Sequence, residues 1–82
     1  MNERFRYYFL KGCVFVYDTS STFVVFYKGG AWHEECNMSL KDFASAKVLS
    51  EQEALEKTNG DNPLEYVEDL IEQDMLKTIY CP

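Results

Sequence analysis

Two neighbouring segments, residues 13–17 and 22–28, are rich in aromatic and β-branched residues on both faces of a strand. This feature limits the fold more than any other. Such residues favour strands, but a half-exposed strand alternates apolar and polar side chains, and these two segments do not. A strand that is apolar on both sides has to be covered on both sides. We therefore expect both segments inside a small sheet with material packed on each face.

The connections around these segments are short and carry turn residues. Residues 18–21 read Asp-Thr-Ser-Ser, whose short side chains bond to the local backbone, and Gly29-Gly30 is a two-residue hairpin signal. With the aromatic run at 5–11 and the alternating run at 31–36, they predict an antiparallel β-meander of three to four strands over residues 5–36. The hairpin register pairs Tyr27 with Trp32, and residues 31–36 form an edge strand.

Two short helices are predicted after the sheet. Ser50 and Glu53 have the spacing of a capping box and open a helix that ends at Asn59-Gly60. Asn62 and Pro63 open a second helix that runs to residue 77. At 100° per residue its apolar arc, which we expect to pack on the sheet, consists of Leu64, Val67, Leu70, Ile71 and Met75. The fold class is therefore α+β.

The stretch between sheet and helices, residues 37–49, is predicted to be irregular. Residues 39–43 form at most one helical turn, with Leu40 and Phe43 facing inward, and residues 47–49 form a short extended segment. Residues 78–82 are expected to be a tail. With 82 residues and no linker or repeat, we expect one domain over residues 1–82.

Composition excludes some classes of protein. The chain is 46% hydrophobic, too apolar for disorder, yet no apolar run approaches the roughly 20 residues of a membrane span, and no signal peptide is recognised. We expect a cytoplasmic protein that does not associate with membranes. The three widely spaced cysteines fit a reducing compartment, either as buried apolar residues or with a Cys13–Cys36 bridge. None is closely paired with another ligand, so no metal site is predicted.

Charge is unevenly distributed along the chain. Residues 1–47 carry six Lys or Arg and five Asp or Glu, whereas residues 48–82 carry two Lys and nine Asp or Glu. An acidic surface repels nucleic acid and attracts basic partners, although it also serves solubility. Ten aromatic residues in 5–32 suit base stacking, but the basic groove that usually accompanies such a surface is missing. We expect no direct nucleic-acid binding.

No catalytic set emerges from the sequence. His33, the single histidine, lies on the predicted edge strand, where neighbouring residues point to different sides and cannot form a Cys–His pair with it. The carboxylates of the last helix are expected to be solvated, which does not suit acid–base catalysis. We therefore predict a protein that is not an enzyme and uses no cofactor.

The leading hypothesis is a non-enzymatic protein-binding module that contacts a partner of basic charge. Four carboxylates on the outer arc of the last helix are the candidate contact residues: Glu65, Glu68, Asp69 and Glu72. An alternative is a nucleic-acid mimic, an inhibitor whose carboxylates replace phosphates in the basic groove of a nucleic-acid-binding host protein. A small hydrolase or redox enzyme is the third hypothesis.

One resemblance extends over residues 28–63. The segments Lys28-Gly-Gly-Ala-Trp32, Val48-Leu-Ser-Glu-Gln-Glu-Ala-Leu55 and Asn59-Gly-Asp-Asn-Pro63 resemble small accessory proteins of bacteriophages and mobile elements. The resemblance implies a phage or mobile-element accessory function. Some acidic proteins of that kind inhibit host defence systems, including CRISPR nucleases. It assigns no functional residue of this chain.

Assembly follows from the doubly apolar strands. One amphipathic helix covers one face of a small sheet, which would leave the other face with an apolar patch larger than monomers usually expose. We therefore expect a homodimer built sheet to sheet, or a permanent partner. In the rival arrangement, residues 39–46 and the N-terminal residues fold over the second face and close the core within one chain.

Overall fold

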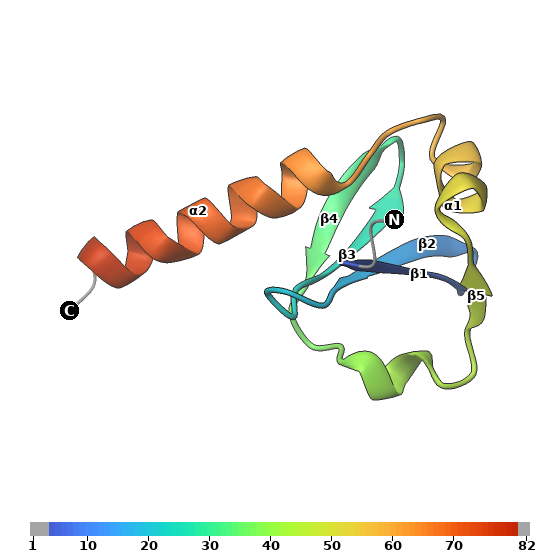
Figure 1. Cartoon of the computed structure of the whole chain (residues 1–82), viewed down its shortest axis with the longest axis horizontal. Helices are drawn as coiled ribbons and strands as arrows, with labels where there is room; N and C mark the ends of the chain where they lie inside the picture. The colour runs from blue at the N-terminus through green and yellow to red at the C-terminus, as the bar shows by residue number, and fades with distance from the viewer. Residues whose placement is uncertain (1–3, 81–82) are drawn as a thin grey trace.

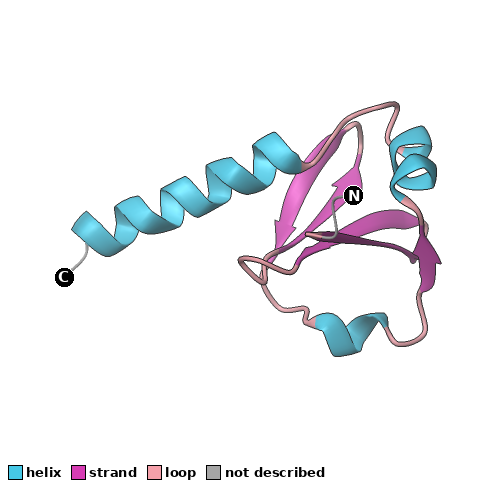
Figure 2. Cartoon of the chain, viewed as in Figure 1, coloured by secondary structure: helices cyan, strands magenta, loops and turns pink. Residues whose placement is uncertain are grey.

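The structure is a computed structural model that describes the backbone of residues 4–80 and the side chains of residues 4–76. The predicted α+β class is confirmed: an antiparallel sheet precedes two helices, and the last helix packs on the sheet (Figure 2). The helix predicted to end at residue 77 continues to Tyr80, so part of the expected tail is helical. The rest of that tail, residues 81–82, lies outside the described residues.

Five strands form the sheet. The first four are β1 (Phe5–Leu10), β2 (Cys13–Asp18), β3 (Val24–Lys28) and β4 (Ala31–Glu35), and each pairs with the next, as the predicted meander requires. The short extended segment becomes a fifth strand, β5 (Lys47–Leu49), which pairs antiparallel with β1. The spatial order is β4-β3-β2-β1-β5, so the doubly apolar β2 and β3 are internal strands.

The β3–β4 hairpin has the predicted register. Tyr27 lies opposite Trp32, and Lys28 lies opposite Ala31. Gly29 and Gly30 both adopt positive φ, at 63° and 79°, which a residue with a Cβ rarely does. The loop chemistry thus places Trp32 on the same face of the sheet as Val14 and Val25.

The first face of the sheet is covered by the first helix and by the beginning of the last helix (Figure 1). Helix α1 (Glu51–Lys57) begins with the predicted capping box, in which the Glu53 amide donates to Ser50 Oγ and the Ser50 amide donates to Glu53 Oε1. Helix α2 (Leu64–Tyr80) follows, and its Leu64 amide donates to Asn62 Oδ1 at 2.8 Å. Ala54 from α1 and Val67 from α2 join one buried cluster whose sheet members are Phe5, Tyr7, Val14, Val16, Val25, Trp32 and Leu49.

Interactions at both ends of α1 also hold this helix against the sheet. The Lys57 ammonium lies 4.6 Å from the centre of the Phe9 ring, a cation–π contact with β1. Burial, together with the neighbouring carboxylate of Glu51, raises the pKa of Tyr7 to about 12. Both ends of this short helix are therefore in contact with side chains of β1.

The second face is covered by residues 37–46, which we call the covering segment. It contains one turn of 3₁₀ helix, η1 (Leu40–Phe43), and runs from the end of β4 to β5 on the side of the sheet opposite α1 (Figure 1). Phe43 is 4% exposed, and its ring stacks on Tyr8 with centroids 4.5 Å apart and an interplanar angle of 3°. Met38 and Ala46 pack against the same cluster, which includes Phe15 and Val24.

Two predictions about this region need correction. Phe43 faces inward as predicted, but Leu40 is 44% exposed, because a turn this short directs one side of its surface to the sheet and the other to solvent. The second face is not left open, because the covering segment buries its centre within the chain, as in the rival arrangement. A homodimer is therefore not needed to cover this face. The homodimer stays a prediction, but an open apolar face no longer supports it.

An ion pair that the sequence patterns did not predict closes one end of the sheet. Asp18 is fully buried at the end of β2 and accepts two hydrogen bonds from the Arg4 guanidinium, at 2.9 and 3.0 Å. It also accepts from the Ser20 amide and the Ser21 hydroxyl, at 3.0 and 2.6 Å. Burial by itself raises the pKa of the Asp18 carboxyl, but these hydrogen bonds outweigh burial and leave the pKa below its ordinary value.

Candidate functional site

Only the first half of α2 packs on the sheet. Val67 is 1% exposed. Tyr66, Leu70 and Ile71 are partly buried against the buried cluster on the first face of the sheet. From residue 72 to residue 76 every side chain is exposed. Figure 1 shows the reason: the C-terminal half of the helix extends past the edge of the sheet. The chain therefore presents more than one helical turn, residues 72–76, with little beneath it.

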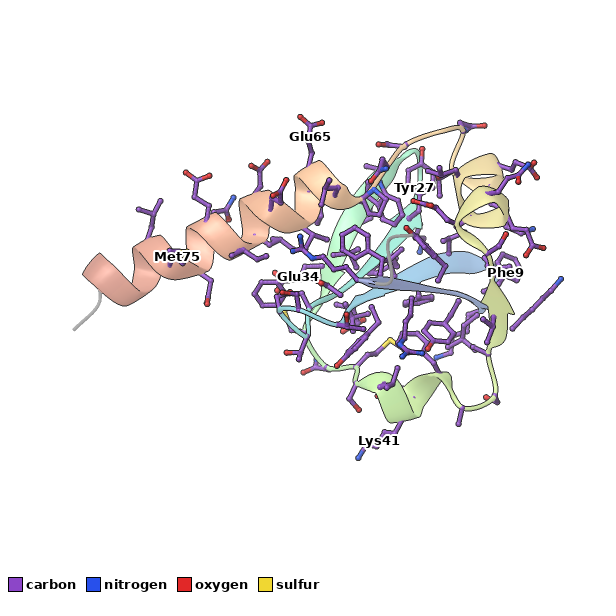
Figure 3. All side chains as sticks on the ribbon, viewed as in Figure 1. Phe9, Tyr27, Glu34, Lys41, Glu65 and Met75 are labelled. Carbon is purple, nitrogen blue, oxygen red and sulfur yellow. The ribbon has the colours of Figure 1, made fainter. Side chains whose placement is uncertain are left out.

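The apolar arc of α2 differs from the predicted one. Val67, Leu70 and Ile71 face the sheet as expected, but Met75 is 60% exposed and Leu64 is 36% exposed. Met75 lies beyond the sheet edge (Figure 3), and Leu64 is the first residue of the helix. Tyr66, which the helical wheel did not include, packs against the sheet in their place.

The four predicted contact residues share the outer face of the helix. Glu65, Glu68, Asp69 and Glu72 are all exposed, and Figure 3 shows Glu65 directed away from the sheet. Two exposed apolar residues follow toward the C-terminal end: Leu76, 44% exposed, lies on this face, and Met75, 60% exposed, lies at its border with the sheet-facing arc. We call these six residues the outer stripe. Sequence reasoning missed its apolar part, because it placed Met75 in the core and gave Leu76 no role.

One member of the outer stripe is close to the rest of the domain. The pKa of Arg4 is raised, chiefly by its hydrogen bond to Asp18 and to a smaller degree by the negative charge of Glu68. Glu68 is therefore the carboxylate on the border of the stripe, near the buried ion pair. Because Glu68 acts on Arg4, the other three carboxylates of the stripe, Glu65, Asp69 and Glu72, are the residues to change when the outer face is tested.

The structure describes three of the remaining candidate residues: His33, Cys13 and Cys36. His33 is exposed on β4, its ring stacks on Phe26 at 5.3 Å, and its Nε2 lies 3.1 Å from the Lys28 carbonyl oxygen. Cys13 is half-buried with a free thiol, so no bridge joins it to Cys36, which is exposed rather than buried. Cys81 lies outside the described residues.

Two surface hollows on the described part of the chain are wide open to solvent. One of about 570 Å³ is lined by residues of α1 and the loop after it, among them Leu55 and Asn59. Another of about 450 Å³ lies beside the covering segment and includes Lys11, Glu35 and Asp42. The carboxylates of the second already accept backbone hydrogen bonds from Asn37 and Ser39. Within residues 4–80, no group of three or more His, Cys, Asp and Glu residues could hold a metal ion.

Comparison with protein-family models, curated proteins and solved structures finds no match. The similarity to phage and mobile-element accessory proteins therefore stays a prediction. None of the helices in the described residues has the length and apolar character needed to cross a membrane. Fold and surface together define a small α+β domain whose most distinctive feature is a helix that extends beyond its sheet.

Proposed function

We propose that this protein is a non-enzymatic protein-binding module and that the outer stripe of α2 is its contact surface. One observation supports the proposal above all others. The helix is anchored on the sheet by Val67 and its neighbours, yet it exposes four carboxylates and, past the sheet edge, Met75 and Leu76. A helix that is docked by its N-terminal half and exposed on its outer face can bind a partner without disturbing the core.

Charge defines the kind of partner. Helix α2 contains five Asp or Glu residues and one Lys, and the whole chain has a formal net charge of −6. Such a surface accelerates association with a positively charged surface and disfavours acidic ones. The partner we propose is therefore a protein with a basic contact surface, and the rate of association should fall as salt screens the attraction.

The test is a binding experiment with matched charge-reversal variants. Wild-type protein captures partners from a lysate of the source organism, and the double variant Asp69→Lys/Glu72→Lys should lose them. The control Glu56→Lys/Asp61→Lys makes the same change in net charge at two exposed positions outside α2 and should retain them. Equal loss of capture by both variants would show that total charge, and not the outer stripe, determines binding. Full capture by both would show that the carboxylates of the outer stripe do not contribute to binding.

The alternative is that the protein mimics nucleic acid. The composition of the outer stripe favours this function less than it favours a protein-binding module. A phosphate mimic needs carboxylates along its whole contact surface, whereas the projecting part of this stripe is apolar at Met75 and Leu76. Salt separates the two functions. Affinity that depends mainly on charge falls steeply between 50 and about 200 mM salt, whereas an interface with an apolar centre retains much of its affinity.

A further inference from the structure

We propose that Met75 and Leu76 are the apolar anchors of a helix-in-groove interface, and that the partner has a groove with an apolar floor and a basic rim. This inference rests on the proposed function and names the geometry of its partner. Amphipathic helices commonly bind in this way, with apolar side chains at helical spacing inserted into a hydrophobic groove. Because the groove has a basic rim and this chain has a net charge of −6, the partner is a different protein and not a second copy of this chain.

Helical geometry connects the anchors to the acidic residues. Leu76 lies four residues after Glu72 and seven after Asp69, spacings that place all three on one side of a helix. Met75 lies three residues after Glu72 and seven after Glu68. The acidic half and the apolar half therefore form one continuous contact surface that a single groove can accept along its length.

The exposure of the anchors also supports a partner. Interface energy is concentrated in a few residues that become fully buried, and rim charges mainly add rate and orientation. Met75 is 60% exposed and Leu76 is 44% exposed, so both have apolar surface left to bury. Short helical segments without tertiary contacts are marginal in water. A partner that covers the projecting turns would stabilise them as well as gain this apolar contact.

Self-association through the same stripe is disfavoured by charge. If two copies paired antiparallel with their stripes in full overlap, Asp69 of one copy would lie near Glu72 of the other, and Glu65 would be brought against Leu76. Like charges brought together at an interface oppose binding. If the copies met only through Met75 and Leu76, the contact would be far smaller than the roughly 800 Å² that each partner of a specific complex buries.

Photo-crosslinking locates the interface. A benzoylphenylalanine in place of Glu72 lies one helical turn from both anchors, and the same probe in place of the exposed Leu40 serves as the control, because the covering segment lies on the opposite face of the sheet. We expect one protein to be crosslinked from position 72 and not from position 40. Crosslinking from position 72 only to a second copy of this chain, or to nothing, would overturn the inference.

Titration of the crosslinked protein, produced in pure form, then tests the anchors. Met75→Ala/Leu76→Ala should weaken its binding about tenfold or more with unchanged salt dependence. Leu40→Ala/Val48→Ala, which truncates two exposed apolar residues elsewhere, should bind as wild type. If the anchor variant binds normally while Asp69→Lys/Glu72→Lys fails, the proposed function stands and this inference is wrong. If both variants bind normally, both are wrong.

Discussion

Replacing Phe43 with Ala tests whether the covering segment closes the second face of the sheet. The ring is 4% exposed, stacks on Tyr8 and contacts Phe15 with centroids 5.7 Å apart. Removing most of the roughly 150–250 Å² that a buried aromatic side chain withdraws from water, at about 25 cal/mol per Å², costs about 4 kcal/mol. This agrees with the about 3–5 kcal/mol typical of Phe-to-Ala changes in cores. A chain of this length has a total stability of only about 4–12 kcal/mol.

Thermal unfolding followed by circular dichroism gives the measurement. The midpoint should fall by about 15–30 °C, because 1 kcal/mol corresponds to about 4–8 °C in a domain of this size. The variant should also bind a dye for apolar surfaces. Leu40→Ala is the matched control: the residue belongs to the same 3₁₀ turn but is 44% exposed, and its loss should change the midpoint by only a few degrees.

Equal midpoints for the two variants would refute the reasoning, because Phe43 would then not be buried in solution. Sedimentation of the wild-type protein in the same series tests the homodimer prediction. A homodimer would sediment at twice the 9.6 kDa of one chain. If the Phe43→Ala variant self-associates and the wild type does not, the covering segment is what keeps the second face from pairing with another copy.

Three further predictions concern the ion pair and helix α2. Asp18→Asn should cost about 3 kcal/mol, because it removes the charge that pairs with a partly buried guanidinium. The folded pKa of Asp18 is below the unfolded value of about 3.9. The stability that Asp18 contributes is therefore present above about pH 4 and is lost as the pH falls through the folded pKa. In a stability–pH curve measured by urea unfolding, Asp18→Asn should therefore flatten the acid limb. Val67→Ala should lower stability to urea by about 1–3 kcal/mol, whereas Met75→Ala should change it by less than about 0.5 kcal/mol; equal effects would contradict the observed docking of α2. Asp69→Lys/Glu72→Lys should leave the midpoint of unfolding within a few degrees of wild type, and a large loss of stability would mean that these carboxylates support the fold.

Much of the fold follows from local chemistry that the sequence displays directly. The two glycines at the β3–β4 turn determine the hairpin register, and Ser50 with Glu53 determines where α1 begins. The doubly apolar character of β2 and β3 implies cover on both faces, and this was confirmed. In each of these cases the residues concerned lie a few positions apart, so the local sequence determines the local structure.

The candidate surface was predictable only in part. Helical periodicity separates Glu65, Asp69 and Glu72 from the residues that pack on the sheet, and their exposure follows from it. The same periodicity placed Met75 in the core, because a helical wheel contains no information on where the sheet beneath the helix ends. The boundary between the docked and the projecting half of α2 depends on the width of the sheet and the direction of the helix.

Tertiary structure alone decided which segment covers the second face and what holds the sheet end together. The sequence shows that the internal strands need two covers, but Phe43 reaches Tyr8 only because the chain crosses the sheet between β4 and β5. Arg4 and Asp18 are separated by 14 positions and meet because β1 and β2 are antiparallel neighbours. Contacts of this kind depend on how elements pair in space, and local propensity does not contain that information.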